Sequence, residues 1–76
     1  MRLIAPDGTR EWLAVRDYAA RLTAADFTES LWPQEDGDKV VYAHLVQTWV
    51  RKLGPCQVLI VKPRPDAGPE QTRYWV

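Results

Sequence analysis

Cysteine and histidine are almost absent from this chain. Of its 76 residues, one is a cysteine, Cys56, and one is a histidine, His44. A lone cysteine cannot form an internal disulfide or supply the ligands of a cysteine-based zinc site. Chains without disulfides are typical of the cytosol, so we expect a cytoplasmic protein. Charged residues interrupt the N-terminal region from Arg2 onward, and no apolar run has the length of a signal or membrane-spanning segment.

The chain also lacks a net charge, because ten basic and ten acidic residues balance. The two signs are unevenly placed. Residues 1–38 hold four basic and eight acidic side chains, whereas residues 39–76 hold six basic and two acidic ones. A basic C-terminal half is typical of a surface that faces a polyanion such as DNA. Neutralisation of one half by the other is the alternative interpretation.

Turn-forming residues divide the first half into short elements. Pro6-Asp7-Gly8-Thr9 stands between two apolar runs, and Pro, Asp and Gly each favour a tight turn for a separate backbone reason. We therefore expect a β-hairpin over residues 2–15. Alanine and arginine in Val15–Leu22 favour one or two helical turns. Thr23 and Asp26 have the spacing of a helix cap and predict a second short turn that leads into Phe27.

Extended and turn segments follow. Ser30–Trp32 is extended and stops before Pro33, and residues 34–38 form a polar turn. Leu53–Cys56 joins two apolar, β-branched runs, and its Gly-Pro pair predicts a chain reversal there. Val58–Val61 is short, continuous and apolar, which is typical of a strand buried on both faces.

Residues 40–53 carry two conflicting signals. Their apolar side chains recur at helical spacing with polar side chains opposite them, which indicates an amphipathic helix ended by Gly54. The same stretch contains four valines together with Tyr42, Thr48 and Trp49, and all of these residue types favour a strand. Spacing indicates a helix, and composition indicates a strand.

Six short segments occur in a recognisable order: Arg21–Phe27, Trp32-Pro33, Val41–His44, Thr48–Leu53, Cys56–Lys62 and Thr72–Trp75. In this order they resemble an internal segment of bacterial insertion-sequence transposases of the DDE type, over about residues 15–76. The most specific pieces are Arg51-Lys52-Leu53 and Arg73-Tyr74-Trp75. The resemblance favours a strand for residues 40–53.

The resemblance implies a parent domain with a ribonuclease H-like fold, in which three acidic residues hold two magnesium or manganese ions for DNA cleavage and joining. The matching stretch looks like the β-rich part between the second catalytic Asp and the helix that carries the catalytic Glu. It therefore carries over no catalytic residue and no metal site. We expect a protein that is not an enzyme on its own. Termini are usually polar and frayed, so the apolar ending Tyr74-Trp75-Val76 indicates either a truncated frame or a strand locked into the sheet. Of the two, we favour a truncated frame.

The fold expected from these arguments is one small α+β domain over residues 1–76, a fragment of a larger transposase. Its main part is an antiparallel β meander with strands near residues 40–53, 57–62 and 72–76. An N-terminal hairpin and one or two short helices pack on this meander.

Basic and aromatic residues alternate in the second half and are the candidate DNA contacts. The candidates are Trp49, Arg51, Lys52, Lys62, Arg64 and Arg73. We expect the meander to bring the two sides of this group together, so that the cations neutralise phosphates and the aromatic rings stack on bases. The alternative interpretation is a solvated charged face with tryptophans in the core.

The remaining reactive residue types have structural interpretations. Asp7, Asp36 and Asp38 lie in predicted turns. His44 has no identifiable acid–base neighbour, and Cys56 is expected to behave as a small buried hydrophobe. Two functions remain: a noncatalytic transposase fragment that contacts DNA, and an independent small protein of a phage or mobile element. The second would bind a protein partner, a role for which four tryptophans are well suited.

Overall fold

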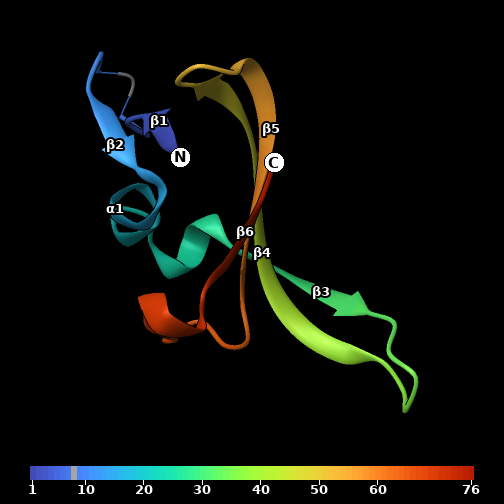
Figure 1. The fold of residues 1–76 in the computed structure, drawn as a ribbon. Helices are drawn as coiled ribbons and strands as arrows, with labels where there is room; N and C mark the ends of the chain where they lie inside the picture. The colour runs from blue at the N-terminus through green and yellow to red at the C-terminus, as the bar shows by residue number, and fades with distance from the viewer. Residues whose placement is uncertain (8) are drawn as a thin grey trace.

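A curved antiparallel sheet organises the computed structural model, which describes residues 1–7 and 9–76. Within these residues the sheet has six strands in the order β2-β1-β4-β5-β6, and β3 also pairs with β4 (Figure 1). The strands are β1 (Arg2–Ile4), β2 (Trp12–Ala14), β3 (Thr28–Trp32), β4 (Lys39–Val50), β5 (Gly54–Lys62) and β6 (Arg73–Trp75). The helical segments are α1 (Val15–Ala20) and the two 3₁₀ turns η1 (Ala24–Asp26) and η2 (Pro69–Gln71). The broad expectation of a mainly antiparallel β domain with short helices is confirmed.

Residues 40–50 belong to the central strand β4, so the conflict over this stretch is settled in favour of a strand, while residues 51–53 form a turn. The apolar residues of β4 sit four apart, in the sets Val41, Leu45, Trp49 and Tyr42, Val46, Val50. A spacing of four matches one turn of a helix, but it is also even, so it keeps side chains on one face of a strand. The two sets therefore occupy opposite faces of β4. Because both faces carry apolar residues, the combined pattern imitates the spacing of a helix.

β4 has partners along both edges. β5 pairs with it from Tyr42↔Lys62 to Val50↔Gly54. The other edge is shared, because β3 pairs with the start of β4 and Leu3 of β1 pairs with Val50 at its end. The expected meander of β4, β5 and β6 is confirmed, and the N-terminal hairpin contacts it as expected, through a strand pairing that the sequence did not predict. The hairpin extends the same sheet, since β4 is long enough to accept two short strands on one edge.

The reversal between β4 and β5 comes earlier than the Gly-Pro pair predicted. Arg51–Leu53 forms the turn, in which the Leu53 N–H donates to the Val50 carbonyl oxygen at 3.0 Å. Gly54 and Pro55 are the first residues of β5. Pro55 is tolerated because β6 reaches β5 only at Leu59–Val61, so the outer edge of β5 needs no N–H donor at Pro55.

The N-terminal elements agree with the local sequence signals. β1 and β2 form the expected hairpin, with Arg2 opposite Ala14. Gly8, for which a turn conformation was expected, lies outside the described residues. Asp7 accepts hydrogen bonds from the backbone N–H and the hydroxyl of Thr9. The Thr23 N–H donates to the Asp26 carboxylate at 2.7 Å and completes the predicted cap of η1.

The main hydrophobic cluster lies on one face of the sheet, which we call the inner face. Leu3, Val50, Val58 and Ile60 are the largest side chains with no appreciable exposure. Tyr18 and Ala19 of α1 and Phe27 after η1 pack against them, and Figure 1 shows α1 to one side of the β4–β5 ribbon. Val61 is buried on the opposite face, as expected for the continuous apolar run in β5. We call that opposite face the outer face.

Candidate functional site

The six residues that the sequence singled out for DNA contact fall into two separate groups. Trp49, Arg51 and Lys52 lie at the turn between β4 and β5, whereas Lys62, Arg64 and Arg73 lie toward the other end of β5. The eight residue steps from Gly54 to Lys62 span about 27 Å at the usual rise of a strand. The meander therefore does not bring the two groups together, because the hairpin turn pairs Trp49 with Pro55 rather than with Lys62.

The first group gains a residue that sequence reasoning missed. The Arg51 N–H donates to the Arg2 carbonyl oxygen at 2.9 Å and ties β1 to the turn. Arg2, Arg51 and Lys52 line one open hollow together with Met1, and no acidic residue lines it. We call these three cations the basic end. Only the pairing of β1 with β4 places Arg2 there, since 49 positions separate it from Arg51.

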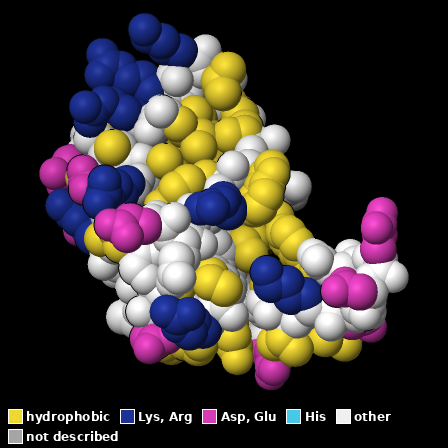
Figure 2. All heavy atoms as spheres, turned by 60° about the horizontal axis from the view of Figure 1, so that its bottom comes forward, with side chains coloured by type: hydrophobic (Ala, Val, Ile, Leu, Met, Phe, Trp, Pro, Cys, Tyr) yellow, Lys and Arg dark blue, Asp and Glu magenta, His cyan; other side chains and the backbone are white. Residues whose placement is uncertain are grey.

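The basic end is electrostatically available to an anion. The ion pairs within residues 1–7 and 9–76 are Arg21–Glu11 at 3.3 Å and Arg64–Asp66 at 3.1 Å. Neither involves the basic end, whose side chains all belong to exposed residues. Figure 2 shows a group of basic side chains at one end of the molecule, whereas acidic side chains are spread over the rest of this face. Three uncompensated cations on one corner create a local positive potential that attracts phosphate groups.

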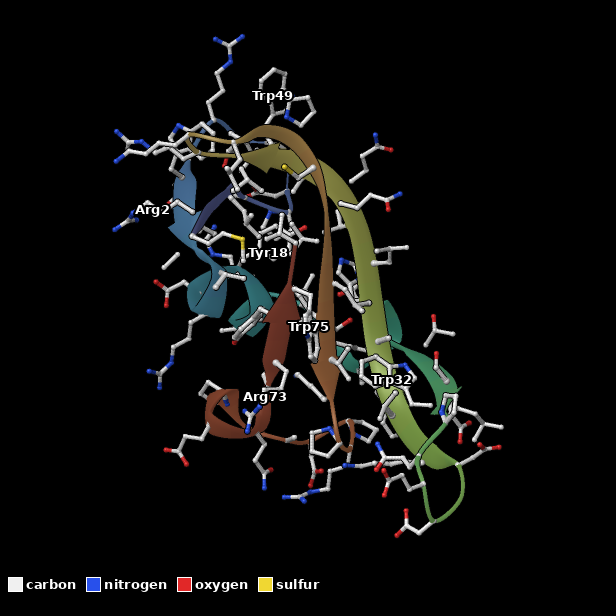
Figure 3. The ribbon with its side chains drawn as sticks, turned by 45° about the vertical axis from the view of Figure 1, so that its right-hand side comes forward. Arg2, Tyr18, Trp32, Trp49, Arg73 and Trp75 are labelled. Carbon is white, nitrogen blue, oxygen red and sulfur yellow. The ribbon has the colours of Figure 1, made fainter. Side chains whose placement is uncertain are left out.

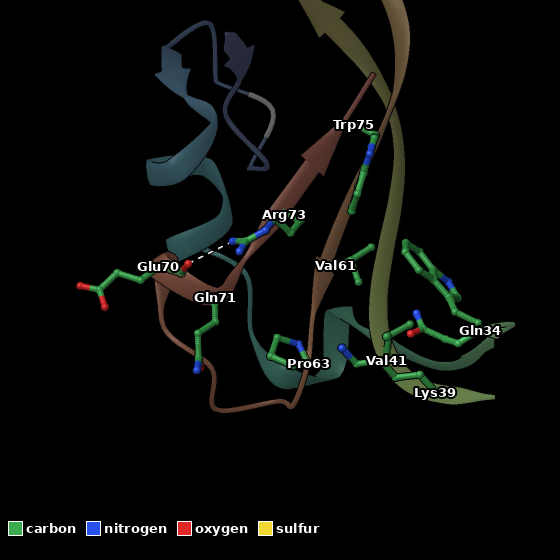
Figure 4. A pocket seen from close by; sticks show the side chains of 10 residues that line it. Gln34, Lys39, Val41, Val61, Pro63, Glu70, Gln71, Arg73 and Trp75 are labelled. Atoms are coloured by element: carbon green, nitrogen blue, oxygen red, sulfur yellow. Dashed lines mark hydrogen bonds between the residues drawn. The ribbon is translucent and has the colours of Figure 1, made fainter. Parts of the chain in front are cut away.

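The second group is engaged in contacts within the chain. The Lys62 ammonium lies 4.6 Å from the centre of the Phe27 ring, on the inner face. Arg64 pairs with Asp66 and donates to the Gln71 side-chain oxygen at 3.1 Å. Arg73 donates to the carbonyl oxygen of Glu70 (Figure 4) and to that of Thr72. These contacts hold the segment between β5 and β6, so this group is a weaker candidate for DNA contact than the basic end.

The outer face exposes large apolar side chains. Leu45, Trp49 and Trp75 are 62%, 58% and 45% exposed. Their positions alternate with inward-facing residues of β4 and β6. Figure 3 shows three labelled tryptophans spread along the sheet, with Trp49 at the hairpin turn and Trp32 and Trp75 lower down. A face of this kind is typical of an interaction surface, because monomeric proteins rarely leave contiguous apolar patches uncovered.

A hollow of about 350 Å³ interrupts the outer face at its lower end (Figure 4). Its apolar lining comes from Trp32, Val41, Val61, Pro63 and Trp75. Its polar lining comes from Gln34, Lys39, Glu70, Gln71 and Arg73. We call it the aromatic hollow. Apolar walls with a few polar groups suit a partly apolar ring or side chain, and two cations on its rim favour an aromatic guest.

His44 has a structural contact on the inner face. Its Nδ1 donates to the Asp26 carbonyl oxygen at 2.9 Å, so Nδ1 carries the proton. Its ring lies 5.9 Å from that of Phe27. Nε2 of His44 and the hydroxyl of Tyr74 are buried and have no hydrogen-bond partner in the described part of the chain. Burial raises the pKa of Tyr74 above the usual 10.0.

The acidic residues and Cys56 do not gather into a reactive centre. Asp7 and Asp36 lie in the turns expected for them. Cys56 is half-buried against the core. Among the described residues, no group of three or more His, Cys, Asp or Glu side chains could hold a metal ion. The described helices also include none with the length and apolar character needed to cross a membrane.

Comparisons with protein-family models, with curated proteins and with solved structures gave no match to this chain.

Proposed function

We propose that this chain is a noncatalytic segment of a DDE-type transposase that contacts DNA phosphates through its basic end. The observation that carries the proposal is the gathering of Arg2, Arg51 and Lys52 from two distant parts of the chain on one corner without an acidic neighbour. Arg51 and Lys52 also belong to the most specific piece of the transposase resemblance.

The chemistry of the basic end suits the DNA backbone rather than base edges. Each guanidinium or ammonium group can neutralise one phosphate and release its counterion. Such contacts position a duplex without reading its sequence. Trp49 lies beside the turn and is 58% exposed, so an unpaired base could stack on its ring.

On this proposal the ribonuclease H-like catalytic centre, with its acidic residues and its magnesium or manganese ions, belongs to other parts of a parent enzyme. The described residues do not fit such a centre, since they contain no cluster of metal-ligating side chains. The chain would then act in the cytoplasm as a positioning element for DNA recombination and not as an enzyme on its own. Its protein partner would be the remainder of that transposase.

A mobility-shift assay with duplex DNA at several salt concentrations tests DNA contact. Three neutralised phosphates predict a log–log salt slope near −2.7, from about 0.9 per phosphate. The double variant Arg51→Ala, Lys52→Ala should flatten the slope to about −0.9. Arg64→Ala is the matched control, because Arg64 is paired with Asp66 away from the basic end. Absence of binding at low salt, or equal loss in both variants, would refute the proposal.

A second function is favoured by the outer face. Leu45, Trp49 and Trp75 present exposed apolar surface, and tryptophan is enriched among residues that dominate protein interfaces. The alternative is therefore an independent small protein of a phage or mobile element that binds a protein partner. The neighbouring nucleotide sequence separates the two. A continuing frame with an upstream Asp strand and a downstream helical Glu supports the transposase segment, whereas an independent promoter and unrelated neighbours support the small protein.

A further inference from the structure

The outer face has complementary features at equal distances from Leu45. Trp49 protrudes four residues after Leu45, and Val41, in the wall of the aromatic hollow, lies four residues before it on the same strand. Leu45 is 62% exposed at the midpoint. At the rise of a strand, protrusion and hollow are each about 14 Å from Leu45 along β4.

Charged residues at the two ends of β4 are also equally spaced from Leu45. Lys52 follows Leu45 by seven residues, and Asp38 precedes it by seven. Lys52 belongs to the basic end with Arg2 and Arg51. Asp38 belongs to an exposed turn with Glu35 and Asp36, which we call the acidic turn. Three cations at one end of β4 thus correspond to three carboxylates at the other.

We propose that the outer face binds a second copy of this chain, with the two β4 strands antiparallel and a two-fold axis near Leu45. In this arrangement Trp49 of each copy enters the aromatic hollow of the other. The basic end of each copy faces the acidic turn of the other. A two-fold interface requires one self-complementary patch, in which residue i meets residue j and j meets i. Trp49 with the hollow, and the basic end with the acidic turn, meet that requirement.

The dimensions of the molecule permit such an interface. An apolar cavity of about 150 Å³ accepts benzene, so the hollow of about 350 Å³ has room for the larger indole ring. The cations of Lys39 and Arg73 at its rim would favour an aromatic guest. The chain measures 42 × 23 × 19 Å, so its largest side is comparable with the roughly 800 Å² per partner that a standard interface buries. Its zero formal net charge removes long-range repulsion between copies.

Self-association goes beyond DNA contact and is measured without DNA, so either proposal can fail alone. Sedimentation velocity of the 76-residue chain over a concentration series should show a monomer–dimer equilibrium. Leu45→Glu places two carboxylates at the axis and should weaken dimerisation by at least about tenfold. Leu31→Glu is the matched control. Leu31 is 64% exposed, but it lies on β3 opposite Val40, outside the outer face, so the dimer should persist.

The contribution of Trp49 is tested in the same way. Trp49→Ala should weaken dimerisation by at least about tenfold, because it removes a buried aromatic anchor. Trp12→Ala is the control, since Trp12 is also exposed but lies on β2. Circular dichroism of each variant verifies that the fold is retained.

Charge reversal gives the sharpest test. The variant Arg51→Glu, Lys52→Glu and the variant Glu35→Lys, Asp36→Lys should each be monomeric, because like charges would then face each other at both ends of the interface. An equimolar mixture of the two should dimerise, since each reversed end then meets an end of opposite charge. A wild-type chain that stays monomeric at all concentrations would overturn the proposal. So would a mixture that fails to associate, or a Leu31→Glu variant that dissociates as readily as Leu45→Glu.

Discussion

The indole rings of Trp32 and Trp75 lie 5.6 Å apart at an angle of 60°, although they come from strands on opposite edges of the β4–β5 ribbon. Trp32 belongs to β3, which pairs with β4, and Trp75 belongs to β6, which pairs with β5. Their contact shows that this part of the sheet curls across its strands. It also helps to explain why Val41 and Val61, which line the same hollow, are buried although they face away from α1.

This aromatic pair should contribute measurably to stability. Trp32→Ala and Trp75→Ala should each lower the free energy of unfolding, and a double-mutant cycle should give a coupling energy of about 1 kcal/mol, as tilted aromatic pairs do. Urea denaturation, at protein concentrations too low for dimerisation, measures this coupling energy. Trp12→Ala, combined with Trp75→Ala, serves as the uncoupled comparison, and equal coupling in both cycles would contradict the assignment.

Lys52 holds a conformation that favours glycine. Its φ is 74°, in the left-handed region, and it is the non-glycine residue with positive φ in the described chain. That conformation costs a side-chain-bearing residue roughly 1 kcal/mol, so Lys52→Gly should raise the free energy of unfolding by about that amount. Arg51→Gly in the same turn should lower it, because Arg51 has no such strain to relieve. A loss of stability in Lys52→Gly, measured by urea denaturation, would show that side-chain contacts outweigh the strain.

Acid should weaken the cap of η1. The backbone N–H of Thr23 beside the Asp26 carboxylate lowers the pKa of that carboxyl below 3.8. A depressed folded pKa means that the stabilisation is present above about pH 3.8 and is lost as the pH falls through the folded value. The urea midpoint of the wild type should therefore fall more steeply below pH 4 than that of Asp26→Asn, which cannot titrate. Parallel curves for the two proteins would show that the cap contributes nothing to acid sensitivity.

DNA and a second copy of the chain should compete for the basic end. If Arg2, Arg51 and Lys52 bind phosphates, they cannot face the acidic turn of another copy at the same time. When excess duplex is added to a dimeric sample at low salt, sedimentation velocity should show the dimer replaced by complexes that hold one copy of the chain at each DNA site. The variant Glu35→Lys, Asp36→Lys, which is expected to be monomeric, should bind DNA at least as tightly as the wild type. Dimers that bind DNA with undiminished affinity would show that the two surfaces are separate.

Local signals in the sequence were sufficient to predict most of the individual elements. Thr23 and Asp26 predicted the cap of η1, the N-terminal apolar runs predicted the first hairpin, and residues 34–38 predicted the polar turn in which the Gly37 N–H donates to Gln34. These features depend on backbone preferences and on contacts between residues at most twelve positions apart. Such interactions are already present in a short segment, so they can be read from the chain in order.

Long-range pairing determined the rest. The spacing of four in β4 is compatible with a helix and with two strand faces, and the pairing with β5 together with the packing of its inner face distinguishes them. Arg2 joins the basic end because β1 pairs with the end of β4, and Trp32 meets Trp75 because the sheet curls. Both contacts join residues more than 40 positions apart. Neither follows from local preference, since each depends on which strand edges and apolar faces the whole chain brings together.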